Sequence, residues 1–255
     1  VTLSAWGDNG NECSLFAIMP QLVYFSVLAY TNDLSKDNLN KVCKTVSGIS
    51  FNDFLKLDIA NGHKNKYYSI LTNPAKYLMY NDPMCGLMDY HVDSTYNEYY
   101  KRCINILKLR EKRSKNWSYL FKTQIALCDY LSIKSNMGND LYKLYNDKDK
   151  LGLKKYIEET VPKAIKKLDS FISAFRNSWY IENKTFGFDV IEHRLGGQMQ
   201  RLKEIIYRVE KYLLGEIEHI EEFEQKKLPY NYPNEKGLVY KHNTKFIMSP
   251  FFPVV

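Results

Sequence analysis

Apolar side chains recur every three or four residues from Leu15 to Phe223, a spacing that places them on one face of an α-helix. One continuous stripe consists of Val161, Ile165, Leu168, Ile172, Phe175 and Trp179. A second stripe runs from Val190 to Lys227 and predicts a helix of about ten turns, which needs a partner along its length. The pattern therefore predicts a mainly α protein.

Capping residues divide the remaining pattern into helices. The apolar run from Leu15 to Tyr30 follows a cap at Ser14 and is expected to be buried, with Pro20 marking a kink or a break. Further starts and stops predict helices over residues 35–44 ending at Gly48, 50–58 opened by a capping box of Ser50 and Asp53, 74–81 after Asn73, 94–115, 117–136 ending near Gly138, and 140–147.

Two further stretches do not fit simple helices. Asp82, Asp89 and His91 crowd among apolar residues, either as a surface that faces another domain or as a turn between helices. Gly196 and Gly197 lie inside the second stripe, where each costs about 1 kcal/mol relative to Ala. We expect a close approach at these glycines, by another helix, by a ligand or by a second subunit.

The first fourteen residues have a different pattern. Val1, Leu3 and Ala5 alternate with polar residues and predict a short strand, which ends at Trp6. A polar loop with the carboxylates of Asp8 and Glu12 follows, and then the apolar helix. Such a strand, loop and helix form the kind of unit that closes a parallel (β/α)8 barrel, in which the loop after the strand faces the active site. The alternative is a core tryptophan beside a solvated turn.

This stretch resembles the final barrel strand of glycoside hydrolase family 20, the β-N-acetylhexosaminidases, in which a Trp is followed two residues later by an acid. The chain has Trp6, Gly7 and Asp8 at this point, with Asp8 in place of the commoner Glu and with Glu12 as a longer alternative. Two later segments are similar to the helical region that follows the barrel in a bacterial branch of the family. They are residues 77–90 and 179–201, the second including Asn183, Lys184, Phe186, Gly187, Phe188, Asp189, Arg194, Leu195, Gly196 and Gly197.

The resemblance implies removal of terminal N-acetylhexosamine from a glycan. In this family the acetamido oxygen of the substrate attacks the anomeric carbon, a Glu protonates the leaving oxygen, and an adjacent Asp orients the acetamide. The sequence contains no Asp-Glu dipeptide, so we expect no catalytic residue in this chain. Trp6 is expected to wall the acetamide pocket, and Asp8 or Glu12 to accept hydrogen bonds from sugar hydroxyls.

Charge and cysteine content bear on other possible functions, such as nucleic-acid binding and metal binding. The 36 Lys and Arg against 29 Asp and Glu give a net charge of +7, but the two signs alternate along the helices, so we expect no nucleic-acid partner. The five cysteines are scattered and predict reduced, mostly buried thiols, and no metal or cofactor motif occurs. No run of 18 apolar residues predicts a membrane span, and we expect a cytoplasmic location.

Taken together, the sequence predicts a helical bundle domain over residues 31–255, preceded at residues 1–30 by the last β/α unit of a (β/α)8 barrel. The chain would be the C-terminal part of a β-N-acetylhexosaminidase that has lost its upstream residues, inactive alone and homodimeric. The alternative from another class is a non-enzymatic helical interaction module.

Overall fold

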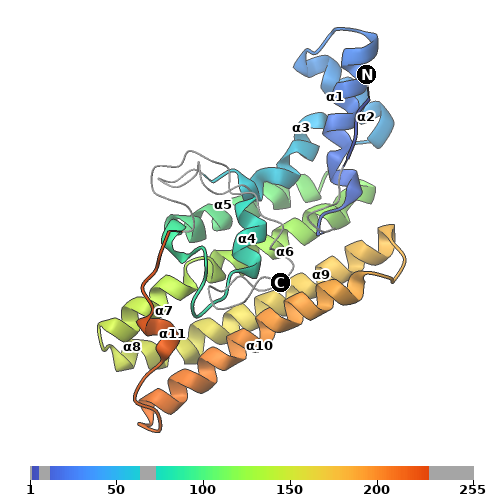
Figure 1. Ribbon diagram of the computed structural model, residues 1–255. Coiled ribbons are helices and arrows are strands. Elements are labelled where there is room, and N and C mark those ends of the chain that lie inside the picture. Colours follow the sequence, from blue (N-terminus) through green and yellow to red (C-terminus); the bar gives the residue numbers. More distant parts are fainter. Residues whose placement is uncertain (1, 6–11, 64–72, 230–255) are drawn as a thin grey trace.

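The computed structural model describes residues 2–5, 12–63 and 73–229 (Figure 1). Helices are the regular elements throughout these ranges, and no β-strand forms within them. The prediction of a mainly α fold is therefore confirmed. Residues 2–5 form no strand, and the barrel unit predicted for residues 1–30 stays a prediction.

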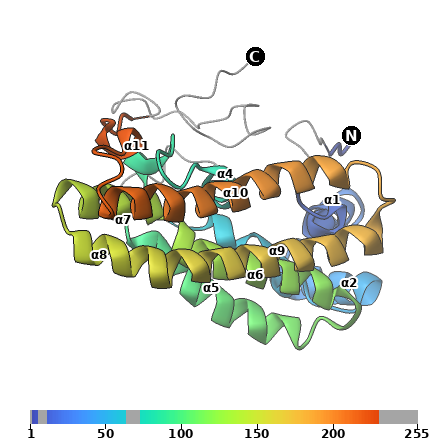
Figure 2. The same cartoon turned by 90° about the horizontal axis from the view of Figure 1, so that it is seen from below.

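Four long helices form the bundle. In the order of packing they are α5 (Thr95–Glu111), α6 (Ser118–Lys134), α9 (Val161–Glu182) and α10 (Phe188–Leu213). Each lies beside the next in both views (Figures 1 and 2). The connection from α6 to α9 consists of α7 (Met137–Asn146), α8 (Lys150–Lys155) and one π-helical turn, Tyr156–Thr160.

The predicted stripe on α9 provides the central contact of the bundle. Val161, Leu168, Phe175 and Trp179 are buried, while Ile165 and Ile172 are half-buried at the edge of the same face. Leu153 and Ile157 extend the buried face back through the π-helical turn into α8. The stripe is thus core, as its spacing predicts.

The N-terminal helices lie at one end of the bundle, coloured blue in Figure 1. They are a 3-10 turn (Leu15–Ile18), α1 (Met19–Tyr30), α2 (Lys36–Ser47), α3 (Phe51–Phe54) and a second 3-10 segment (Leu55–Asn61). Trp117, before α6, joins them to the bundle because its indole nitrogen donates a hydrogen bond to the Ser47 carbonyl at 2.8 Å. Its ring also packs edge-on against Phe16 and Phe54.

Local signals set the ends of α2 and α3. The Ser35 side chain accepts a hydrogen bond from the Asn38 amide, and Gly48 ends α2 with a φ of 83°, a backbone conformation that favours glycine. The Ser50 side chain accepts from the Asp53 amide, as the capping box predicts.

The prediction that residues 15–30 are buried is wrong. Only Pro20, Val23 and Val27 are buried in α1, whose main neighbour is α2. Pro20 marks a break, as predicted: the 3-10 turn ends at Ile18, and Pro20 lies in the first turn of α1, where no backbone donor is needed. Apolar side chains on the uncovered faces are exposed, namely Leu15, Phe16, Leu22, Tyr24, Leu28 and Tyr30.

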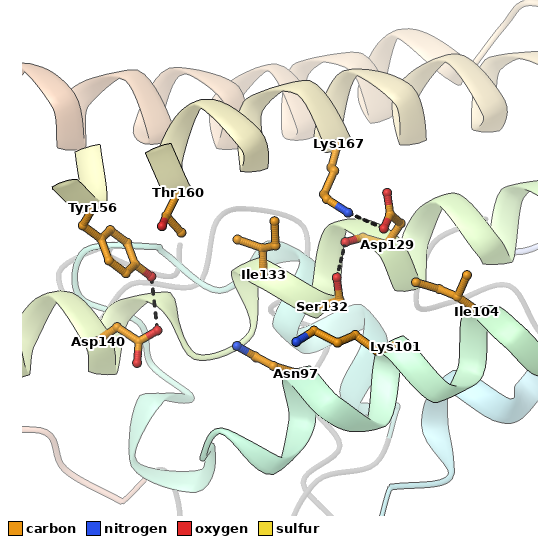
Figure 3. A pocket seen from close by; sticks show the side chains of 10 residues that line it. All are labelled: Asn97, Lys101, Ile104, Asp129, Ser132, Ile133, Asp140, Tyr156, Thr160 and Lys167. Atoms are coloured by element: carbon orange, nitrogen blue, oxygen red, sulfur yellow. Dashed lines mark hydrogen bonds and ion pairs between the residues drawn. The ribbon is translucent and has the colours of Figure 1, made fainter. Parts of the chain in front are cut away.

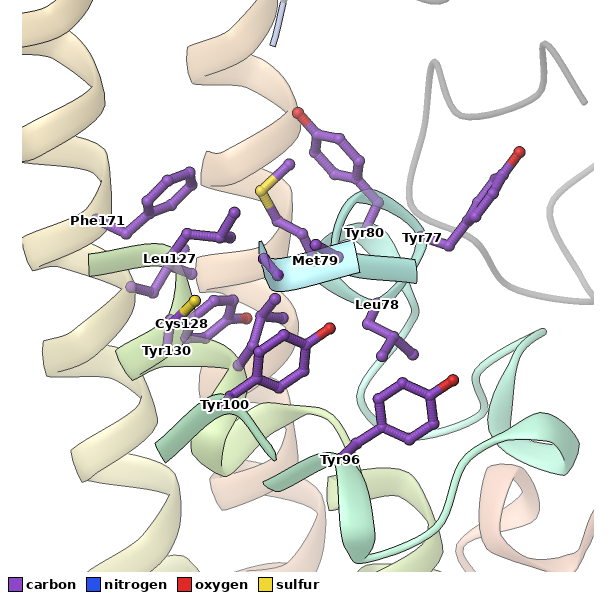
Figure 4. Close-up of a cluster of buried hydrophobic side chains, with 14 of the residues drawn as sticks. Tyr77, Leu78, Met79, Tyr80, Tyr96, Tyr100, Leu127, Cys128, Tyr130 and Phe171 are labelled. Atoms are coloured by element: carbon purple, nitrogen blue, oxygen red, sulfur yellow. The ribbon is translucent and has the colours of Figure 1, made fainter. Parts of the chain in front are cut away.

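A short helix, α4 (Pro74–Tyr80), contributes several residues to the core. It lies against α6 and α10, and all its residues except Lys76 are buried. Figure 4 shows its side chains meeting those of α5, α6 and α9. Tyrosine is common here, and Tyr77, Tyr80, Tyr96, Tyr100 and Tyr130 are all fully buried.

The predicted ten-turn helix is also wrong, because α10 ends at Leu213. Gly215 adopts a φ of 74°, and the chain turns back toward α7 through α11 (Glu221–Glu224). Ile220 and Phe223 then enter the core from this returning segment. Ile220 and Phe223 continue the apolar spacing of α10, so the sequence predicts one long helix. The structure buries the same two side chains after the chain reverses direction at Gly215.

The fold also excludes the helix-packing explanation for one of the paired glycines. Gly196 is exposed, and a Cβ added there would meet nothing within 4 Å. No helix among the described elements therefore approaches Gly196.

Across residues 2–5, 12–63 and 73–229, no helix is both long and apolar enough to cross a membrane.

Candidate functional site

The residues proposed from the sequence to contact substrate are Trp6, Asp8 and Glu12. Trp6 and Asp8 lie outside the described residues. Glu12 is described, and its side chain is only 9% exposed. Its surroundings therefore define the candidate site.

Three side chains from the helical bundle surround the Glu12 carboxylate. Arg194 donates from Nη1 to Oε1 in a short ion pair, and Lys76 donates from Nζ to Oε2 at 2.8 Å. The Tyr80 hydroxyl donates a longer hydrogen bond of 3.4 Å to Oε1. Lys76 and Tyr80 come from α4 and Arg194 from the first half of α10, so two separate helices hold one acid.

The aromatic ring of Tyr80 forms one wall of this cluster. The Arg194 guanidinium carbon lies 3.7 Å from the ring centre, within the range of a cation–π contact. Burial raises the pKa of the Tyr80 hydroxyl well above its usual value, and the nearby Glu12 charge acts in the same direction. Tyr80 therefore stays a neutral donor.

Arg194 keeps unused hydrogen-bonding capacity. Its side chain is 8% exposed, and its Nε and Nη2 atoms are buried without a hydrogen-bond partner. Two cations, Arg194 and Lys76, contact the Glu12 carboxylate from two different helices. Such charge-assisted hydrogen bonds fix an acidic residue firmly.

A second link lies two residues farther along. The Ser14 hydroxyl donates a 2.6 Å hydrogen bond to Glu182, the last residue of α9. Ser14 also caps the following 3-10 turn, as predicted, through the Phe16 amide. Residues 12–14 are thus attached to α4, α9 and α10 at once.

The crowd of polar residues after α4 is a buried turn. Asp82 accepts hydrogen bonds from the Met84 and Cys85 amides, both at 2.9 Å, and pairs with Arg201 at 2.7 Å. Asp82, Asp89 and His91 are each less than 5% exposed. Of the two readings left open by the sequence, the turn between helices therefore describes these residues.

Asp89 organises the same turn. It accepts a hydrogen bond from the Asn81 side chain at 2.8 Å and pairs with Lys227 from the returning C-terminal segment. A Cβ at Gly86 would collide with Asn81, and one at Gly138 with Asp89. Gly138 is therefore required for this contact within the first turn of α7, and α6 ends at Lys134, shortly before Gly138 as predicted.

A buried lysine completes this network. Lys134, at the end of α6, donates to the carbonyls of Leu78 and Asn81 and is 2% exposed. Burial lowers its pKa to about 7, although Asp89 and Asp82 act in the opposite direction. The network thus contains one group poised to change charge near neutral pH.

A groove of about 500 Å³ lies elsewhere, between α5, α6 and the π-helical turn (Figure 3). Two pairs form inside it: Lys167 pairs with Asp129, and the Tyr156 hydroxyl donates to Asp140 at 3.2 Å. The side-chain oxygen of Asn97, which also lines the groove, is buried without a hydrogen-bond partner. Burial raises the pKa of Asp140. The groove contains none of the residues that the sequence proposes for substrate contact, so the Glu12 cluster is kept as the candidate site.

The structure also gives the state of the cysteines and of possible metal ligands among the described residues. All five cysteines are free, with Cys13 exposed and the other four buried. Among residues 2–5, 12–63 and 73–229, no group of three or more His, Cys, Asp and Glu side chains is placed to hold a metal ion.

The sequence pointed to Glu12 but not to its partners. Arg194 lies in the quoted segment 179–201 and Lys76 just before the segment 77–90, yet nothing in their spacing joins them to a residue near the N-terminus. The sequence does place Lys76 and Arg194 on helices that are otherwise apolar on the opposite face. Long basic side chains in such positions lie at the margin of the core.

Comparison with known proteins supports the resemblance. A search of curated proteins finds no match. A family profile described as Glycoside Hydrolase 20C C-terminal domain matches residues 50–241, which is about three quarters of the chain. The match starts at the cap of α3 and includes Lys76, Tyr80 and Arg194, while Glu12 precedes it. The helical bundle with this match shows that the chain belongs to the Glycoside Hydrolase 20C C-terminal domain family.

Proposed function

We propose that this chain is the C-terminal portion of an exo-acting β-N-acetylhexosaminidase that removes terminal N-acetylhexosamine by substrate-assisted hydrolysis. In this proposal, the chain supplies residues of the active-site loop and a helical domain, and the catalytic Asp-Glu pair belongs to a preceding barrel. The single observation that carries the proposal is the match to the helical C-terminal domain of this glycoside hydrolase family.

Two features of the structure support it. The exposed apolar faces of α1, including Leu22, Tyr24 and Leu28, are what the last helix of a barrel would present to its neighbouring barrel helices. In addition, the end of the polar loop at Glu12 is attached to the bundle. A loop held in this way is suited to a fixed role in a binding site.

The roles proposed for the loop residues follow from their chemistry. The Trp6 ring would hold the acetamide group in the attacking geometry, and Asp8 or Glu12 would accept a hydrogen bond from a sugar hydroxyl. Poor positioning of reacting groups is costly in rate, so these residues should affect turnover although they carry out no bond breaking.

The test compares the gene product containing this chain and its upstream sequence with the isolated 30.0-kDa chain, using a chromogenic N-acetyl-β-glucosaminide. The longer protein should hydrolyse the substrate, and the isolated chain should not. In the longer protein, Trp6→Ala should lower kcat/KM by about 100-fold while the thermal unfolding midpoint changes little. Absence of activity in a folded longer protein would instead favour the helical interaction module.

Dimerisation is a second part of the proposal. Exposed apolar side chains gather around the turn between α9 and α10, at Tyr180, Ile181, Phe186 and Val190. Nearby on α10, the open surface at Gly196 would let another backbone approach closely. We propose a second copy of this chain as the partner that covers this surface.

A further inference from the structure

We propose that the groove between α5, α6 and the π-helical turn is a binding site for an uncharged, polyhydroxylated ligand, namely a small saccharide. This inference goes beyond the proposed function, because it uses only residues that line the groove and none near the N-terminus. The volume of the groove, about 500 Å³, lies within the range of roughly 300–1,000 Å³ that is typical of small-molecule sites.

The charge of the lining is the first step. Two basic and two acidic side chains line the groove, namely Lys101, Lys167, Asp129 and Asp140. Lys167 pairs with Asp129. Lys101 pairs with Glu98 at 2.7 Å, so each lysine of the groove has a carboxylate beside it. Asp140 accepts hydrogen bonds from two neighbouring side chains. A lining balanced in this way favours an uncharged ligand over an anion or a cation.

The hydrogen-bonding capacity of the lining is the second step. Asn97 keeps a buried side-chain oxygen without a partner, and a ligand hydroxyl would supply the missing donor once the amide rotates toward the groove. The Ser132 hydroxyl donates to the Asp129 carbonyl and keeps its lone pairs as acceptors. An ammonium group has three donors, so Lys101 and Lys167 can each hold a carboxylate and still donate to a ligand. Hydroxyl groups, which donate and accept, match this mixed lining.

Apolar side chains and the π-helical turn complete the groove. Ile104 and Ile133 are half-buried and offer apolar surface to the C–H face of a sugar ring. Tyr156 and Thr160 are the first and last residues of the π-helical turn, and both line the groove (Figure 3). Such turns are rare and are frequently found at functional sites. Here the turn brings two hydroxyl-bearing side chains to one wall of the groove.

The experiment titrates the isotope-labelled chain with four monosaccharides of similar size and follows the backbone amide shifts by NMR. Glucose and N-acetylglucosamine are uncharged, glucuronate is an anion and glucosamine is a cation. Both uncharged sugars should bind in the millimolar range, with shifts concentrated in residues 97–104, 129–133 and 156–160. Glucuronate and glucosamine should bind about threefold more weakly or worse, because the paired lining offers neither charge a free partner.

Two pairs of variants on α5 test the lining. Asn97→Ala should raise the Kd for N-acetylglucosamine about 5- to 10-fold without lowering the thermal unfolding midpoint, because the oxygen that it removes is unpaired in the free protein. Asn105→Ala is the matched control, since Asn105 is exposed on the same helix outside the groove. Lys101→Ala, at an exposed position, should also weaken binding, whereas Lys108→Ala should not. This second pair keeps the test valid if Asn97→Ala fails to fold.

Several outcomes would overturn the inference. They are an absence of shifts with all four sugars, shifts confined to other parts of the chain, tighter binding of glucuronate or glucosamine, and equal Kd values for a folded groove variant and its control. Tighter binding of N-acetylglucosamine than of glucose would support the site and add the acetamido group to what it recognises. Equal binding would support recognition of hydroxyls alone. Hexosaminidase activity enters none of these measurements, so failure of the proposed function would leave them unchanged.

Discussion

The Arg194 guanidinium stacks on the Tyr80 ring with 3.7 Å between its central carbon and the ring centre, while its Nη1 atom binds Glu12. The ring thus contributes more to the cluster than its hydroxyl, whose hydrogen bond to Glu12 is long at 3.4 Å. We expect Tyr80→Phe to cost less than about 1 kcal/mol of unfolding free energy and Tyr80→Leu about 2–4 kcal/mol. Urea denaturation measures both, and equal costs would show that the ring has no special role.

The buried tyrosine hydroxyls give a second pair of variants. The Tyr130 hydroxyl is buried without a hydrogen-bond partner, whereas the Tyr145 hydroxyl donates to Glu224 at 2.7 Å and accepts from the Ile220 amide. Removing an unsatisfied buried group relieves a desolvation cost, so Tyr130→Phe should leave stability unchanged or raise it by about 1 kcal/mol. Tyr145→Phe should lower it by about 1 kcal/mol. A large loss in Tyr130→Phe would contradict the assignment.

Asp82 combines a cap and an ion pair, which two substitutions separate. Asp82→Asn keeps an oxygen for the Met84 and Cys85 amides but loses the charge facing Arg201, and should cost about 1.5–3 kcal/mol. Asp82→Ala removes both functions and should cost about 3–5 kcal/mol. Chemical denaturation of the two variants checks the order, and an Asn variant as unstable as the Ala variant would mean that the cap contributes nothing.

The position of Lys134 predicts a pH-dependent stability. Its pKa is lowered from 10.5 to about 7, so between these values the unfolded chain binds a proton that the folded chain has released. The unfolding free energy contributed by this group therefore rises with pH across that window, by at most about 1.4 kcal/mol per pH unit, and its cost is fully present below about pH 7. Lys134→Met lacks this term, so wild-type stability measured relative to the variant should increase from about pH 7 to about pH 9. A difference that does not vary with pH would refute it.

Association at the α9–α10 turn gives a fifth prediction. Light scattering of the isolated chain should give twice its mass of 30.0 kDa, and Phe186→Asp combined with Val190→Asp should yield the monomer. Leu151→Asp is the control, because Leu151 is 82% exposed on α8, away from this turn. A wild-type monomer at high micromolar concentration would exclude the dimer.

The sequence predicted local structure well where a cap or a stripe acts within one helix. Ser35, Gly48 and Ser50 mark their helix ends, and the stripe from Val161 to Trp179 faces the core. These features depend on neighbours within four residues, which the sequence places together directly.

The errors and omissions depend on distant partners. Nothing near Gly138 reveals that Asp89, almost fifty residues earlier, requires a glycine there, and apolar composition alone does not show that several apolar side chains of α1 are exposed. The contact between Glu12 and Arg194 spans 182 residues. Such pairs are decided by how the helices pack, and periodicity carries no information about which polar residues meet across a bundle.

The π-helical turn at Tyr156–Thr160 has a consequence for insertions and deletions among relatives. Leu153, Ile157 and Val161 are each four residues apart and all buried, although four residues of an α-helix advance about 40° beyond a full turn. A π-helical turn contains more residues than an α-helical turn, so it offsets this extra rotation. The buried face therefore stays continuous into α9. In a homologue that is one residue shorter here, we expect a regular α-helix. Tyr156 would then point away from Asp140, and the hydrogen bond at the edge of the groove would be lost. In aligned sequences, two consecutive four-residue spacings between apolar residues before the regular stripe would therefore identify the members that keep the π-helical turn.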